Sequence, residues 1–228
     1  GINFVEYFLK KRFPSLSFKI YFYDGQHLKR NSKIMRIDGD SKKIFLIERS
    51  ILNLVQHLSG IATLTNKIVK ITNKKTKILD TRKTLPGLRK LQKYATSIGG
   101  ATNHRMGLYE EILVKDNHIK VLGGMNKTLN VLNKKNIKKF KIECENYEDV
   151  KKALEAGVSY ILLDNMKPEE IKKCMKLKKK LNSCTKFEIT GGIDLNNIKS
   201  YYLLGADYIS VGKITNSAKS VDIGLDII

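Results

Sequence analysis

Two cations stand side by side just after a short apolar run of the sequence ends. Residues 78–90 read ILDTRKTLPGLRK, so that Ile78-Leu79 leads directly into a polar stretch containing Arg82 and Lys83, and a Pro-Gly turn follows. A guanidinium presents a planar fork that matches a carboxylate or a phosphate, and an ammonium adds a point charge. The stretch therefore predicts a binding site for a small anionic molecule.

Arginine is scarce in this chain, which makes its positions informative. Of 43 basic residues only 7 are arginine, and all of these lie at or before Arg105. Arg49, Arg82 and Arg105 stand beside other polar groups at the ends of apolar segments. Chance accounts for any one of these placements, but the three together favour positions where a guanidinium fork is needed.

The overall composition narrows the classes of function. The chain has 228 residues and a formal net charge of +21, but the excess is lysine in runs such as 133–141 and 173–182, which are typical of solvated helix ends. A nucleic-acid-binding surface would more often carry arginine and interleaved aromatic residues, so we expect no nucleic-acid partner.

No apolar run approaches the ~20 residues of a membrane span, and no secretory signal is present, so we expect no membrane partner. Three cysteines without a CxxC pair indicate reduced thiols in a cytoplasmic protein.

The first part of the chain alternates in the manner of short strands, two of them ended by Asp-Gly. We interpret residues 1–48 as a small α+β sandwich domain, which we expect to be truncated at its start. Apolar residues then recur every three or four positions from Glu48 to Thr72, which indicates a helix. The expected elements of the small domain are a helix over 4–13 and strands over 18–25, 32–39 and 42–48.

Beyond that helix, apolar runs alternate with amphipathic stretches. Such alternation predicts parallel strands joined by crossover helices. Six units favour an irregular, incomplete β/α barrel over an open doubly wound sheet. We assign residues 49–228 to this barrel domain and consider a return of its C-terminal tail to the sandwich. The expected strands are 77–83, 111–117, 140–146, 160–165, 187–192 and 208–213, and the clearest helices are 146–157, 167–181 and 194–206.

Each predicted barrel strand is apolar at its start and polar at its C-terminal end. In β/α barrels these ends form one face, where the chemistry takes place. The last two strands end in glycines, whose backbone N–H groups can approach an anion, and the final loops of such barrels commonly bind phosphate. A plain turn is the alternative for the glycine pair. The strand ends carry Arg82, Lys83, Lys115, Asp116, Glu143, Glu145, Asp164, Asn165, Thr190, Gly191, Gly192, Gly212 and Lys213.

Cations, carboxylates and a phosphate-binding end thus share one predicted cavity. That combination suits one substrate bearing carboxylates and another bearing phosphates. Glu143 and Asp164 would hold Mg²⁺ or sugar hydroxyls, or stabilise positive charge developing at a sugar carbon. Their alternative role, compatible with the first, is to balance the cations of the site.

Several long motifs of the chain resemble those of one enzyme family. They are ERSILNLVQHLSGIATLT, LDTRKTLPGLRKLQKYA, GGATNHRMGLYEEILVKDNHI, IECEN, LLDNM and EITGGI, in this order and spread over nearly the whole chain. The family is quinolinate phosphoribosyltransferase, also called nicotinate-nucleotide pyrophosphorylase (carboxylating). The resemblance implies an N-terminal sandwich, an incomplete barrel, and a homodimer or higher multiple of dimers. It implies a pentosyltransferase that joins quinolinate to phosphoribosyl pyrophosphate with Mg²⁺ and no organic cofactor, releasing pyrophosphate and CO2 and giving nicotinate mononucleotide for NAD biosynthesis.

The resemblance also implies roles for individual residues. Lys83 would lie where the two substrates meet, and Glu143 and Asp164 would serve the ribose hydroxyls and Mg²⁺. With Lys115 these are the expected catalytic residues. The implied quinolinate pocket comprises Arg82, His104, Arg105 and Lys115, with Arg49 reaching in from the neighbouring subunit. The implied phosphoribosyl and phosphate contacts are Lys83, Glu143, Asp164, Thr190, Gly191, Gly192, Gly212 and Asn216.

The chain departs from the family pattern in three places. Asn216 stands where many members have histidine, and Thr190 stands where serine is usual. Asparagine can still donate to a phosphate, but not as a cation. The chain also begins later than chains of the family normally do, which bears on the sandwich and the dimer interface.

Three alternatives remain open from the sequence. A phosphoribosyltransferase of the same fold would act on nicotinate or another acid without decarboxylation, and Arg82, Arg105 and Lys115 favour a dicarboxylate over it. An inactive homologue is opposed by the retained Glu143, Asp164 and glycine-rich ends. A basic nucleic-acid-binding protein is the remote alternative.

Overall fold

The computed structural model describes residues 1–73 and 76–228. Its N-terminal part packs helix α1 (Ile2–Arg12) against an antiparallel pair of strands, β1 (Ser17–Ile20) and β2 (Met35–Asp38). The apolar face of α1 buries Val5 and Leu9 at helical spacing, and these side chains form part of a small separate core. The helix and these two strands agree with the sequence prediction, although both strands are shorter than expected.

The predicted strand over 42–48 is wrong, because these residues form the first turns of helix α2 (Ser41–Ile71). Asp40 caps the helix by accepting a hydrogen bond from the backbone N–H of Lys42 at 2.9 Å. Ile44 and Ile47 are buried and three positions apart, while Phe45 between them is exposed. This burial follows a helical period, which continues without a break into the helix that the sequence predicts from Glu48.

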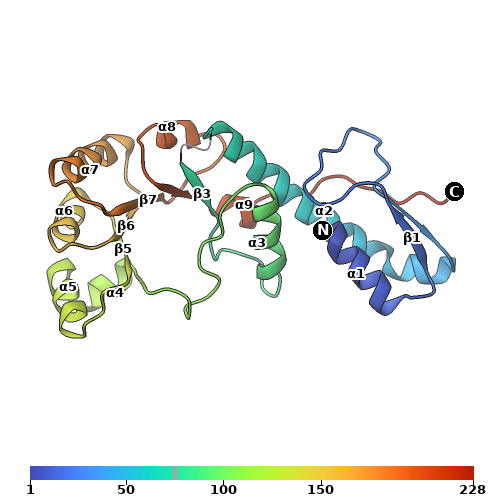
Figure 1. Cartoon of the computed structure of the whole chain (residues 1–228), viewed down its shortest axis with the longest axis horizontal. Helices are drawn as coiled ribbons and strands as arrows, with labels where there is room; N and C mark the ends of the chain where they lie inside the picture. The colour runs from blue at the N-terminus through green and yellow to red at the C-terminus, as the bar shows by residue number, and fades with distance from the viewer. Residues whose placement is uncertain (74–75) are drawn as a thin grey trace.

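Helix α2 connects the two parts of the molecule (Figure 1). Its N-terminal half packs on the small core with α1, and its C-terminal half packs against helix α3 (Arg89–Ile98) of the second part. The expected domain boundary between residues 48 and 49 therefore falls inside a continuous helix. Among the described residues, α2 included, no helix has both the length and the apolar content needed to cross a bilayer.

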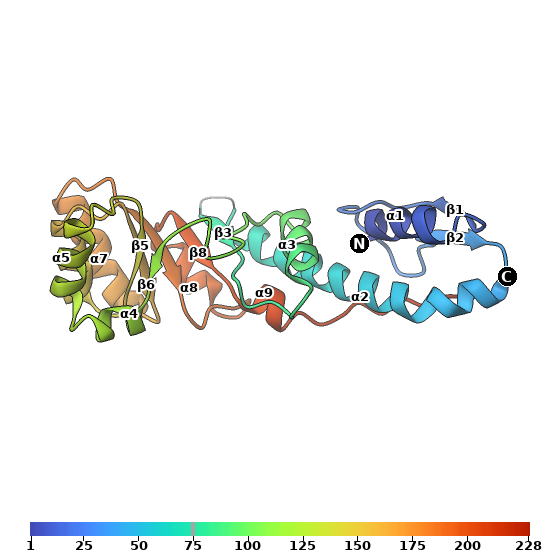
Figure 2. The ribbon, with the colours of Figure 1, turned by 90° about the horizontal axis from the view of Figure 1, so that it is seen from below.

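The second part is a parallel sheet of six strands in the order β3-β8-β7-β6-β5-β4. Although β3 and β4 are consecutive in the chain, they occupy opposite edges, so the sheet forms an incomplete barrel. Helices α5, α6 and α7 lie on one side of it (Figures 1 and 2). The α/β fold with a small N-terminal unit is as predicted. The strands are β3 (Lys77–Leu79), β4 (Leu113–Val114), β5 (Lys141–Cys144), β6 (Tyr160–Asp164), β7 (Lys186–Thr190) and β8 (Tyr208–Ser210), and the remaining helices are α4 (Asp116–Val121), α5 (Met125–Lys134), α6 (Tyr147–Glu155), α7 (Pro168–Lys180), α8 (Ile198–Tyr202) and α9 (Lys213–Asn216).

The strand register separates an apolar face of the sheet from a polar one. Cys144 pairs with Leu163, which pairs with Ile189, and all three are buried in the main core. One residue earlier on each strand, the register aligns Glu143 with Leu162 and Leu162 with Glu188. Because side chains alternate along a strand, these carboxylates point to the face opposite the apolar core. The polar face is where the candidate site lies.

The C-terminal segment returns along α2 to the small N-terminal part (Figure 2). The backbone N–H of Val221 donates to the carbonyl of Gln56 at 3.1 Å, and the Gln56 side chain donates to the carbonyl of Ile223 at 2.7 Å. Ile223 and Leu225 pack against the small core. Gly60 allows this close approach, because a Cβ at that position would lie 2.1 Å from the Lys219 carbonyl oxygen.

Candidate active site

The ends of β5 and β6 bring two carboxylates and a lysine together. Lys115, at the N-terminus of α4, places its Nζ 3.8 Å from Oε1 of Glu143 on β5. Asp164 ends β6 and pairs with Thr190 of β7. The Lys115 backbone N–H donates to Nδ1 of His118 at 2.9 Å, which fixes the first turn of α4 below the ammonium.

Both carboxylates are held in a way that disfavours their charged forms. Burial raises the pKa of Glu143, and the charge of Asp164 adds to this while Lys115 opposes it. Burial also raises the pKa of Asp164, against a hydrogen bond from Asn165 and the charges of Lys83 and Lys115. A divalent cation or hydrogen-bond donors from a ligand would favour the charged forms.

This donor set fits Mg²⁺. Within residues 1–73 and 76–228, no group of three or more His, Cys, Asp or Glu side chains could hold a metal ion by itself. Glu143 and Asp164 lie on neighbouring strands and supply two hard oxygen ligands. Mg²⁺ is commonly held by one or two carboxylates together with substrate phosphates and water, and two carboxylates on neighbouring strands fit that pattern.

Arg82 and Arg105 form a cationic pair in the same region. Burial lowers the pKa of Arg105, and the positive charge of Arg82 lowers it further, while Glu111 and Glu143 oppose the shift. Within the described part of the chain, the buried Nε atoms of both arginines have no hydrogen-bond partner. Arg105 also lines a cavity of about 360 Å³ together with His104 and Glu111. Arg105 is buried and Arg82 half-buried, and a pair of guanidiniums whose Nε–H groups lack an acceptor among the described residues is suited to a ligand that carries carboxylates.

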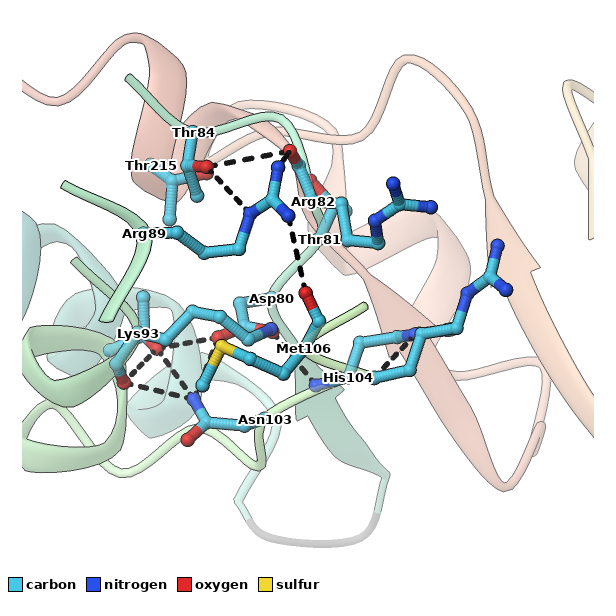
Figure 3. A network of polar contacts seen from close by, with 12 residues as sticks. Asp80, Thr81, Arg82, Thr84, Arg89, Lys93, Asn103, His104, Met106 and Thr215 are labelled. Carbon is cyan, nitrogen blue, oxygen red and sulfur yellow. Dashed lines mark hydrogen bonds and ion pairs between the residues drawn. The ribbon is translucent and has the colours of Figure 1, made fainter. Parts of the chain in front are cut away.

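Arg89 joins the loop after β3 to the loop that carries Arg105. Its Nε donates to Thr84 Oγ1 at 3.1 Å, and its two terminal nitrogens donate to the carbonyls of Met106 at 3.2 Å and Arg82 at 3.4 Å (Figure 3). Sequence reasoning gave Arg89 no role. The scarcity of arginine was the signal that could have singled it out.

A buried carboxylate, Asp80, organises the region behind the two arginines. Asp80 and Lys93 of α3 form an ion pair with side chains 0% and 1% exposed. Asp80 also accepts hydrogen bonds from Asn103 Nδ2 at 2.7 Å and from the backbone N–H of His104 at 2.8 Å (Figure 3). These bonds fix the end of β3 to α3 and to residues 103–105. Lys93 was missed from the sequence, because nothing local distinguishes it from the other lysines of the chain.

His104 lies with its ring largely buried, 8% of the side chain being exposed. Its Nδ1 accepts a hydrogen bond from the backbone N–H of Arg105 at 2.8 Å, and its Nε2 lies 3.6 Å from Oε1 of the buried Glu188. Glu188 was not among the residues expected from the sequence. It stands between the apolar Phe187 and Ile189, two positions before Thr190, which is the signal that could have found it.

The glycine-rich ends of β7 and β8 adjoin the cations. Gly191 and Gly192 have φ angles of +93° and +61°, and a Cβ on Gly191 would lie 2.2 Å from Oδ1 of Asn165. A Cβ on Gly212 would lie 3.3 Å from Lys83 Cδ and 3.9 Å from Asn216 Nδ2. The side chains of Lys83 and Asn216 thus both lie close to the backbone of Gly212.

Arg49 is the expected site residue that the chain does not bring to this cluster. It lies on α2 with 73% of its side chain exposed, and its ion-pair partner is the adjacent Glu48 at 3.8 Å. The other expected residues lie on strands and in loops, apart from Asn216, which ends the short helix α9.

The fold and the site together define an α/β protein that gathers cations, two carboxylates and a glycine-rich backbone at the C-terminal ends of parallel strands. The chain matches two family models, the quinolinate phosphoribosyl transferase N-terminal domain over residues 1–59 and the corresponding C-terminal domain over residues 61–226. The division between them falls within α2. The chain therefore belongs to the quinolinate phosphoribosyl transferase family, as the sequence motifs predicted.

Individual relatives agree with this assignment. The chain is 41% identical over 238 residues to the probable nicotinate-nucleotide pyrophosphorylase [carboxylating] of Methanocaldococcus jannaschii, covering 100% of this chain and 82% of that protein. It is 36% identical over 206 residues to the nicotinate-nucleotide pyrophosphorylase [carboxylating] of Mycobacterium leprae, covering 90% and 72%. The crystal structure of nicotinate-nucleotide pyrophosphorylase from Ehrlichia chaffeensis superposes with a TM-score of 0.93 at 38% identity, covering 99% of this chain and 82% of that one.

The buried ion pair leads to a prediction about stability. Asp80→Asn and Lys93→Met should each lower the free energy of unfolding by about 3–5 kcal/mol, because each leaves one buried charge without its partner. The double variant should cost clearly less than the sum of the two, because no lone charge remains. Urea unfolding at neutral pH measures all three values.

Lys10→Met is the matched control, since Lys10 forms an exposed ion pair with Glu6 and should contribute little. Strictly additive effects of the two buried substitutions would contradict the coupling described for Asp80 and Lys93.

Proposed function

We propose that the protein transfers the phosphoribosyl group of phosphoribosyl pyrophosphate to quinolinate, releasing pyrophosphate and CO2 and giving nicotinate mononucleotide for NAD biosynthesis. The observation that carries the proposal is the pair Arg82 and Arg105, whose buried Nε atoms have no hydrogen-bond partner among the described residues. The charge of Glu143, the ion-pair partner of Lys115, acts on Arg105. The two relatives named above are nicotinate-nucleotide pyrophosphorylases [carboxylating], a name that describes the transfer step in the reverse direction.

In this proposal quinolinate lies against Arg82, Arg105 and Lys115, with the ring of His104 lining the same pocket. Two adjacent carboxylates need several donors in a fixed arrangement, and two guanidiniums with a lysine provide them. Because the arginines are partly withdrawn from water, each charge-assisted hydrogen bond to the substrate is stronger than it would be on an open surface.

The phosphoribosyl group would lie between Lys83 and the glycine-rich strand ends. Glu143 and Asp164 would hold its hydroxyls and Mg²⁺, and the metal would supply charge neutralisation for the departing pyrophosphate. Thr190, Gly191, Gly192, Gly212 and Asn216 would hold the 5′-phosphate, through backbone N–H groups and uncharged side chains.

The chemistry then needs mainly positioning. Lys83 and Lys115 would hold the two substrates in contact, so that the pyridine nitrogen faces the sugar carbon from which pyrophosphate departs. Glu143 and Asp164 would stabilise the positive charge that develops at that carbon. After transfer the ring nitrogen carries a positive charge, and this cation stabilises the carbanion left when CO2 leaves. The carbanion then takes up a proton from water, which gives nicotinate mononucleotide.

Arg49 has a role in the proposal only if two copies of the chain assemble. Its exposed guanidinium on α2 would enter the quinolinate pocket of the partner subunit in a homodimer or a multiple of dimers. We also propose a cytoplasmic location, which is supported by the free state of Cys144, Cys174 and Cys184.

The first prediction is the reaction itself. With quinolinate, phosphoribosyl pyrophosphate and Mg²⁺, the protein should release CO2 and form nicotinate mononucleotide in equal amounts, because decarboxylation follows the transfer. Nicotinate should be a poor substrate, since it lacks one of the carboxylates. Equal turnover of the two acids would favour a different phosphoribosyltransferase, and a folded protein that yields neither product would be an inactive homologue.

A second prediction concerns the quinolinate subsite. Arg105→Lys keeps the positive charge but loses the guanidinium fork, so the affinity for quinolinate should fall by about 10-fold or more while that for phosphoribosyl pyrophosphate changes little. Calorimetric titration with each ligand measures both values. Arg36→Lys on the exposed β2 is the control and should leave both unchanged. Equal losses for the two ligands would show that Arg105 is wrongly placed.

A third prediction tests the shared site. Arg49→Ala and Lys115→Ala should each be inactive alone, but mixed and exchanged subunits should regain part of the activity, because one site of each hybrid keeps both residues. Exchange is verified with differently tagged subunits. Hybrids that form and stay inactive would contradict the shared site.

A further inference from the structure

Behind the substrate-facing arginines, a second buried carboxylate contacts His104. We infer that Glu188 is a positioning residue, which holds the ring of His104 and through it the backbone of Arg105 in the quinolinate subsite. The inference rests on the proposed function for the identity of the ligand, but the contacts on which it depends lie within the described chain.

Three side chains contact the carboxylate of Glu188 at the polar face of the sheet. It is 1% exposed, and its carboxylate accepts hydrogen bonds from the Tyr160 hydroxyl at 2.7 Å and from the Ser210 hydroxyl. His104 Nε2 lies 3.6 Å from Oε1, slightly beyond hydrogen-bond length. Burial raises the pKa of Glu188, but the contacts from His104, Ser210 and Tyr160 outweigh it and the pKa is lowered. The arrangement therefore keeps an anion facing His104.

The contacts of His104 define which ring nitrogen carries the proton. Nδ1 accepts the backbone N–H of Arg105 at 2.8 Å, so this nitrogen must be unprotonated. The hydrogen of the neutral ring then lies on Nε2, which faces the Glu188 carboxylate. Nδ1 is thus hydrogen-bonded within the protein and Nε2 faces a buried carboxylate, while the residue also lines the cavity.

Arg105 is held through these contacts at both ends. Its backbone N–H is fixed by His104, whose own backbone N–H donates to Asp80 at 2.8 Å. One terminal nitrogen of its guanidinium donates to the carbonyl of Glu111 at 2.6 Å. If the ring of His104 turned, the Arg105 N–H would lose its acceptor and the start of the arginine side chain would move. The anion at Glu188 keeps the ring in the required tautomer and orientation.

The test compares Glu188→Gln with Tyr160→Phe. Glu188→Gln keeps the size of the side chain but removes the charge that orients His104. It should raise the KM for quinolinate by about 10- to 100-fold, because a displaced Arg105 binds quinolinate less well. The KM for phosphoribosyl pyrophosphate should change by less than about 2-fold, because Arg105 does not bind that substrate. Tyr160→Phe removes a different donor to the same carboxylate and should leave both KM values close to those of the unchanged protein.

The ring tautomer gives a readout that does not depend on activity. In the unchanged protein, ¹⁵N NMR should show His104 protonated on Nε2 alone, with its signals identified by their loss in His104→Asn. In Glu188→Gln the signals should shift toward a mixture of tautomers. A His104 ring protonated on Nδ1 in the unchanged protein would overturn the inference, even if Glu188→Gln fails to fold.

Two kinetic outcomes would also overturn it. Equal rises of both KM values in Glu188→Gln would indicate a general loss of structure, and a selective rise in Tyr160→Phe would show that the effect does not pass through His104. If the unchanged protein does not use quinolinate at all, the proposed function fails, while the tautomer measurement still decides whether Glu188 orients His104.

Discussion

The buried carboxylate of Asp80 is the constraint on which the rest of the site depends. A charge withdrawn from water is costly unless it is fully paired, and Asp80 meets this cost with Lys93, Thr96, Asn103 and the backbone of His104. Those partners come from α3 and from the loop that follows it. These contacts therefore fix α3 and the loop after it relative to β3. Arg82 follows Asp80 by two residues, and Arg105 directly follows His104, so both arginines are anchored close to the buried carboxylate.

The carboxylates on the polar face of the sheet serve binding but lower the stability of the free protein. The apolar ladder on the opposite face carries the core, while Glu143 and Asp164 are held with raised pKa values by burial. The folded protein holds these protons more tightly than the unfolded chain does. The free energy of unfolding therefore falls as the pH rises from the pKa of each group in the unfolded chain to its higher pKa in the folded protein. A ligand that favours the charged carboxylates reverses this penalty, so the free site is less stable than the filled one.

Local patterns predicted the elements whose burial repeats along the chain. The strand ends that carry Lys115, Glu143 and Asp164 could be found because polar residues follow apolar runs at regular intervals. The strand expected over 42–48 failed because a short apolar run fits either period, and the capping by Asp40 decided for a helix. The contacts of Lys93 and Glu188 could not be predicted, since only the folded chain brings Lys93 to Asp80 and Glu188 to His104. For the same reason the inward-facing role of the His104 nitrogens could not be read from its motif.

The return of the C-terminal segment along α2 has a consequence for the order of folding. Ile223 and Leu225 belong to the core around α1, yet they lie beyond every strand of the sheet in the sequence. During synthesis the small N-terminal part emerges before the sheet but lacks these two side chains until the whole sheet has been made. The apolar surface of the N-terminal part stays partly exposed during that interval. It is covered when the segment carrying Ile223 and Leu225 packs against it.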